Sequence, residues 1–138
     1  EFGHLWEYPL RSVCTISTHD MATLRGWWEE DPELTARYYN HVLGHWGEVP
    51  ATAPGEVCEE IIRQHLQCPS LLAILSFQDW LSMDEELRYP DANAERINVP
   101  ANPRHYWRYR MHLTLEELMK SHKFNEKMRG MIDETNRY

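Results

Sequence analysis

The sequence lacks several features that mark whole classes of protein. Its 138 residues include only 14 Lys and Arg against 22 Asp and Glu, for a formal net charge of −8. Because a protein that binds nucleic-acid phosphates needs a basic face, this shortage of positive charge argues against a nucleic-acid partner. The longest mostly apolar run, Leu71–Phe77, is too short to cross a bilayer, so we expect no membrane-spanning segment.

Cysteine is scarce as well, with only Cys14, Cys58 and Cys68, and there is no CxxC pair. An odd number of widely spaced cysteines is not typical of a disulfide framework, so we predict three buried free thiols. The missing CxxC pair also makes a cysteine-based zinc site unexpected, and we predict no metal and no cofactor. Residues 1–4 show no basic segment leading into an apolar one, so no signal peptide is visible and we expect a cytoplasmic location.

What the sequence does contain is an alternation of strand-like and helix-like segments. Residues 12–18 are rich in β-branched side chains and carry little charge, which predicts a strand buried on both faces. The apolar run at residues 71–77 predicts a second strand. Apolar residues recur at helical spacing in three further segments, residues 32–46, 55–67 and 122–136. Residues 89–104 hold three prolines and predict a long loop, and long loops in small domains are often functional.

Two short helices complete the pattern. One is predicted over Asp79–Leu87, and Thr114–Glu117 has the capping-box pattern that opens another. Strands that alternate with helices indicate βα units with a parallel sheet, and two parallel strands do not make a stable sheet alone. A (β/α)₈ barrel takes roughly 250 residues, more than this chain has. The predicted class is therefore α/β, mainly helical, with the chain as part of something larger.

Three groups of residues are candidates for a functional site. His19 and Asp20 directly follow the first predicted strand, where catalytic side chains of barrel enzymes lie, although such a pair is also common on surfaces. Asn98 in the long loop and Trp107 beyond it offer an amide and an aromatic face that could bind a sugar, or else form a turn and packed aromatics. Trp27 either lines a cleft or packs beneath the strand end.

These segments resemble a known family. Ser12–Asp31 is similar to the seventh-strand region of the 4-α-glucanotransferases, the disproportionating enzymes or amylomaltases of glycoside hydrolase family 77, above all the plant cytosolic and Bacteroides type. Leu71–Asp79 resembles the eighth strand of that family, and Arg96–Pro100 resembles its C-terminal loop. Tyr106–Tyr109 looks like its Asn-Trp-Arg-Trp segment. The resemblance covers nearly the whole chain in order.

The resemblance implies a fold, a reaction and site residues. It implies that the chain is the C-terminal part, about the last two βα units, of a (β/α)₈ TIM barrel. The implied enzyme transfers α-1,4-glucan segments between maltooligosaccharides in starch metabolism and retains the anomeric configuration. Asp20 corresponds to the acidic residue that stabilises the transition state, and His19 to a histidine that binds the same sugar. Asn98 corresponds to a loop residue near the substrate, and we add Trp27 and Trp107 as substrate-binding side chains.

The same resemblance implies an absence. The nucleophile and the acid/base of the family lie on strands that would precede Glu1, so we predict that this chain alone has no transferase activity. Ala101 stands where many relatives have Gly, and since Ala adopts a positive φ less readily, we expect a changed loop. Unpaired strand edges and exposed apolar faces predict either self-association into a homo-oligomer or a partial rearrangement from the fold of the parent barrel. The alternatives are a non-catalytic glucan-binding or assembly module and, less favoured, a metal-dependent phosphohydrolase with His19 and Asp20 as ligands.

Overall fold

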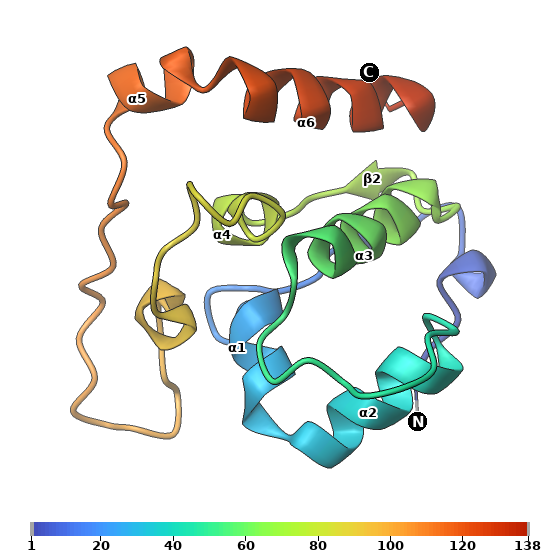
Figure 1. The fold of residues 1–138 in the computed structure, drawn as a ribbon, viewed down its shortest axis with the longest axis horizontal. Helices are drawn as coiled ribbons and strands as arrows, with labels where there is room; N and C mark the ends of the chain where they lie inside the picture. The colour runs from blue at the N-terminus through green and yellow to red at the C-terminus, as the bar shows by residue number, and fades with distance from the viewer. Residues whose placement is uncertain (1, 138) are drawn as a thin grey trace.

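The computed structural model describes residues 2–137, which fold into a set of helices and one small two-stranded sheet (Figure 1). Along the chain the elements are η1 (Leu5–Glu7), β1 (Val13–Cys14), α1 (Leu24–Glu30), α2 (Pro32–His41), α3 (Gly55–Gln67), β2 (Leu72–Ala73), α4 (Phe77–Leu81), η2 (Ala92–Glu95), α5 (Leu115–Lys120) and α6 (His122–Glu134). The two strands run parallel, with Val13 opposite Leu72 and Cys14 opposite Ala73. The sequence also predicts a mainly helical chain with two parallel strands.

The core lies around α3, which spans the range predicted from its apolar periodicity. Its buried apolar side chains are Val57, Cys58, Ile61, Ile62 and Leu66. Trp28 of α1 and Phe124 of α6 are the largest fully buried side chains of the core cluster. Figure 1 shows α6 and α1 on opposite sides of α3. Gly55 permits the start of α3, since a Cβ there would lie 2.8 Å from the backbone oxygen of Met83.

Side-chain caps fix where several helices begin. Asp31 accepts hydrogen bonds from the backbone N–H groups of Glu33 and Leu34, both at 3.0 Å, at the start of α2. Thr114 and Glu117 form the predicted capping box of α5. The sequence reasoning missed α1, whose N-cap is Thr23, because the segment was interpreted as polar residues trailing the first strand.

Both predicted strands are much shorter than predicted and are not buried on both faces. Residues 12–18 give only Val13–Cys14, and residues 71–77 give only Leu72–Ala73. Cys14 is buried, whereas the side chains of Val13 and Leu72 are half exposed. Each strand has one strand neighbour among residues 2–137, so there is no wider sheet to continue the pairing, and the sheet face that carries Val13 and Leu72 is left open to solvent.

Three helix boundaries also differ from prediction. The helix predicted over residues 32–46 ends at His41, because Gly44 has a φ of +73° and turns the chain away, which leaves Trp46 exposed. The helix predicted over Asp79–Leu87 is α4, which starts two residues earlier and ends at Leu81. The final helix, predicted over residues 122–136, ends at Glu134, ahead of a positive φ at Asn136.

The three cysteines are buried and free, as predicted. Burial raises the pKa of the Cys14 thiol to about 12 and that of Cys58 to about 11, so both stay protonated at neutral pH. None of the helices within residues 2–137 combines the length and apolarity needed to span a membrane.

Candidate functional site

The pair His19 and Asp20 lies in the turn between β1 and α1. The backbone N–H of Met21 donates to the carbonyl of Thr18 at 3.1 Å and closes this turn. The side chains of His19 and Asp20 are 54% and 52% exposed, so both can reach a ligand from solvent. Nε2 of His19 lies 3.4 Å from Oδ2 of Asp20. The turn therefore presents an imidazole and a carboxylate side by side.

The long loop brings Asn98 to this carboxylate. Nδ2 of Asn98 donates to Oδ1 of Asp20 at 2.7 Å, across 78 residues of sequence. The backbone N–H of Asn98 donates to the carbonyl of His19 at 3.0 Å, and Nε of Arg96 donates to the carbonyl of Asn98 at 3.0 Å. Both oxygens of Asp20 thus face a polar group, and the loop is tied to the turn by its backbone and by a side chain.

Trp107 extends the same cluster. Its ring centroid lies 5.1 Å from that of His19 with an interplanar angle of 43°, and 61% of its surface is exposed. An exposed indole face beside a carboxylate and an amide is a surface on which a sugar ring can stack. His19, Asp20, Asn98 and Trp107, all predicted as site residues, are therefore in one place.

Trp27 and Asp20 line the same cavity, which has a volume of about 450 Å³. The cavity is lined by Ile16, Asp20, Met21, Ala22, Thr23, Leu24, Trp27, Glu30, Tyr38, Ile61, His65 and Arg96. The ring centroids of Trp27 and Tyr38 lie 5.3 Å apart in an edge-to-face arrangement. Trp28, by contrast, is buried, and its Nε1 donates to the carbonyl of Pro50 at 2.8 Å. Of the two neighbouring tryptophans, only Trp27 therefore lines a cavity that contains Asp20.

A buried carboxylate that the sequence reasoning did not identify holds the turn in place. Asp79 of α4 is fully buried; its Oδ1 accepts from the backbone N–H of Leu24 at 2.8 Å. Its Oδ2 accepts from the hydroxyls of Ser17 at 2.5 Å and Ser76 at 2.7 Å. Ser17 and Leu24 flank the turn that carries Asp20, so Asp79 fixes both of its ends. The available signal was the polar Gln78–Asp79 pair directly after an apolar run.

The expected change of loop shape at Ala101 does not involve a strained backbone. Asn136 is the only residue other than glycine with a positive φ in the described part of the chain, so Ala101 needs no left-handed conformation. Within the same residues, no group of three or more His, Cys, Asp or Glu side chains is arranged to hold a metal ion.

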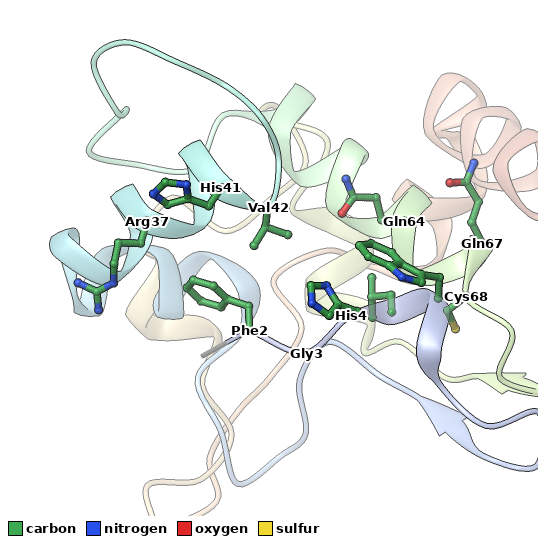
Figure 2. Close-up of a pocket in the computed structure, with 11 residues that line it drawn as sticks. Phe2, Gly3, His4, Arg37, His41, Val42, Gln64, Gln67 and Cys68 are labelled. Carbon is green, nitrogen blue, oxygen red and sulfur yellow. The ribbon is translucent and has the colours of Figure 1, made fainter.

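A second, larger cavity of about 600 Å³ lies away from this cluster. Figure 2 shows the N-terminal segment with Phe2 and His4 beside α2, which carries His41, and α3, which carries Gln64 and Gln67. This cavity contains none of the five predicted site residues.

Comparisons with known proteins agree on one family. The family model of 4-alpha-glucanotransferase matches residues 1–115. The 4-alpha-glucanotransferase DPE2 of Oryza sativa subsp. japonica is 38% identical over 137 residues, which is 99% of this chain and 14% of that protein. The 4-alpha-glucanotransferase of Chlamydia pneumoniae is 30% identical over 125 residues, 90% of this chain and 23% of that protein.

A solved structure has a similar fold. The amylomaltase from Streptococcus agalactiae in complex with acarbose superposes with a TM-score of 0.67 at 19% identity, over 94% of this chain and 23% of that one. The chain therefore spans between about a seventh and a quarter of the length of these relatives.

Proposed function

The chain belongs to the 4-alpha-glucanotransferase family, and we propose that it supplies one part of the active site of such an enzyme, with Asp20 as the group that stabilises the transition state. The observation that carries this proposal is the bond of 2.7 Å from the Asn98 amide to Asp20, beside His19. A carboxylate held by neighbouring donors keeps its orientation without any rearrangement during the reaction, which is what electrostatic stabilisation requires.

The chemistry follows from the charge that develops during glycosyl transfer. In retaining enzymes the sugar passes through an oxocarbenium-like state with positive charge near the anomeric carbon, and a nearby carboxylate stabilises it. The Asn98 amide bonds Oδ1 of Asp20 and the His19 ring faces Oδ2, so each oxygen keeps a further lone pair with which it can accept from a sugar hydroxyl. Trp107, which contacts His19, and Trp27, which lines the cavity that contains Asp20, supply aromatic faces near that position.

The substrate proposed for the whole enzyme is an α-1,4-glucan or a maltooligosaccharide. Support comes from the names of the curated relatives and from the amylomaltase neighbour, which was solved with acarbose. We assign the chain to the last two βα units of the barrel, where a nucleophile and an acid/base from earlier strands would complete the site. Starch metabolism and a cytoplasmic location stay predictions from the sequence.

Two measurements test the proposal. The chain incubated with maltotriose should release no glucose and form no longer maltooligosaccharides, because two of the three carboxylates are missing. A chimera should then be made in which this chain replaces the aligned segment of the rice relative, to which it is 38% identical. We expect the chimera to transfer glucans, and Asp20→Asn to lower its kcat by about 10²-fold or more, the usual effect of removing one electrostatic stabiliser.

The matched control is Asp31→Asn, which removes an exposed carboxylate from the cap of α2 and should leave kcat unchanged. An active chimera that loses nothing with Asp20→Asn contradicts the role of Asp20. Binding of soluble amylose by a chimera without turnover would instead favour the alternative of a non-catalytic glucan-binding module.

A further inference from the structure

A buried ion pair lies beneath the loop that carries Asn98. Nη1 of Arg25 in α1 lies 2.6 Å from Oε1 of Glu95 in η2, and the two side chains are only 5% and 3% exposed. Thr23 donates from its hydroxyl to Oε2 of Glu95 at 3.0 Å. Such a pair is costly to desolvate, so it persists only where hydrogen bonds satisfy both partners.

The same pair also holds the backbone of the loop. Nη1 of Arg25 donates to the carbonyl of Tyr89 at 2.6 Å, and Nε2 of the buried Gln78 donates to the carbonyl of Glu95 at 3.3 Å. The loop is thereby fixed to α1 and α4 at residues 89 and 95, just ahead of Asn98. Burial raises the pKa of Glu95, and the guanidinium and hydroxyl donors oppose that rise.

Among residues 2–137, no hydrogen bond joins Thr23, Arg25, Gln78 or Glu95 to Asp20, but these four residues connect the segments that carry Asp20 and Asn98. Thr23 and Arg25 belong to the segment that follows Asp20, and Glu95 lies three residues before Asn98. Hydrogen bonds from Thr23 and Arg25 thus tie the segment after Asp20 to Glu95, and they add to the direct bonds of Asn98 with His19 and Asp20. The pair at Glu95 therefore helps to set where the chain enters the segment that carries the Asn98 amide.

We propose that Glu95 and Arg25 are positioning residues, whose buried pair holds the loop so that Asn98 meets Asp20. The inference deepens the proposed function and rests on it for its catalytic consequence alone. Glu95→Gln removes the charge at nearly constant volume, so Arg25 remains buried without a counter-ion. We expect the loop to separate locally from α1 while the core around α3 stays folded.

The readout is residue-specific NMR on the 138-residue chain. Glu95→Gln should lower the hydrogen-exchange protection of the Asn98 N–H, which is bonded to His19, by at least about 10-fold, while protection within α3 is kept. The side-chain NH₂ resonances of Asn98 should move toward the positions they have in Asp20→Ala, since both changes remove the same hydrogen bond.

The matched control is Glu59→Gln, which removes another carboxylate from an ion-pair network, between α3 and α6, and should leave Asn98 unchanged. Arg25→Met is a second variant, which removes the guanidinium from the same pair and leaves a carboxyl that can take up a proton, and it decides the question if Glu95→Gln does not fold. The proposal is overturned if the hydrogen-exchange protection of the Asn98 N–H in the folded variant stays within about twofold of the wild-type value. It is also overturned if Glu59→Gln lowers this protection as much as the variant of the Glu95–Arg25 pair does. If Asn98 is released as expected but Asp20→Asn leaves the chimera active, the proposed function fails and this inference stands.

Discussion

Replacing the buried Asp79 with Asn should destabilise the fold more than the same change at Asp31, the exposed cap of α2. Asp79 has no exposed surface and accepts three hydrogen bonds, from Leu24, Ser17 and Ser76. In Asp79→Asn one side-chain oxygen can still accept from the backbone N–H of Leu24. The other becomes an NH₂ group, which has to donate to serine hydroxyls that were themselves donors.

The expected size follows from the difference between charged and neutral hydrogen bonds. A bond to a charged acceptor contributes about 1.5–3 kcal/mol and a neutral one about 0.5–1.5 kcal/mol. A loss of about 1 kcal/mol at each of the three bonds gives a total of about 3 kcal/mol. Because small domains have unfolding free energies of about 5–15 kcal/mol, the variant should remain folded with a clearly lower urea midpoint.

Urea-induced unfolding, followed by far-UV circular dichroism, measures the effect. Asp31→Asn is the control, since Asp31 also accepts two backbone N–H bonds but is exposed, and Asn caps helices as well as Asp does. We expect the control to change the unfolding free energy by less than about 0.5 kcal/mol. If the two variants differ by less than about 1 kcal/mol, Asp79 does not hold the turn in the way described.

Three further outcomes are expected. The Lys127 ammonium lowers the pKa of Glu59 below 4.5. The ionised Glu59 carboxylate therefore stabilises the fold fully above pH 4.5, and this contribution is lost as the pH falls through the lowered pKa. In an acid titration, the urea midpoint of Glu59→Gln should depend less on pH than that of the wild type. Burial lowers the pKa of His65 below 6.5. The unfolded chain therefore binds the proton more readily than the folded chain, and the stability falls as the pH drops below 6.5. His65→Gln should remove this pH dependence in the same titration. Leu72→Lys, on the open sheet face, should reduce self-association in analytical ultracentrifugation, whereas Leu115→Lys, on α5 and even more exposed, should not.

The start of a helix could be predicted from the sequence where a single capping residue sets it. Asp31 and Pro32 start α2, and the box of Thr114 and Glu117 starts α5, because caps act within a few residues of sequence. The length of the strands could not be predicted, because pairing is decided by neighbours far along the chain. Only Leu72 and Ala73 find partners in β1 within the described residues, although the apolar run around them is longer.

For the candidate site as well, local sequence patterns identified residues but not the contacts between them. His19 and Asp20 were identified because they follow a strand-like run. Asn98 and Trp107 were identified because an amide in a long loop and an aromatic side chain just beyond it could bind a sugar. That Asn98 contacts Asp20 depends on a separation of 78 residues, which no local pattern records. The buried charges of Asp79 and Glu95 were missed for a related reason, since a charged side chain in a polar segment is ordinarily solvated.

The contacts around Asp20 bear on why the chain alone should be inactive. Asn98, His19 and the buried Asp79 and Glu95 all belong to this chain, so the carboxylate is oriented without any group from outside it. Under the proposed function, the missing activity of the isolated chain therefore comes from absent reacting groups and not from a disordered site. That distinction has a measurable consequence: supplying the remaining barrel should restore transfer without changing the Asn98 resonances that report its bond to Asp20.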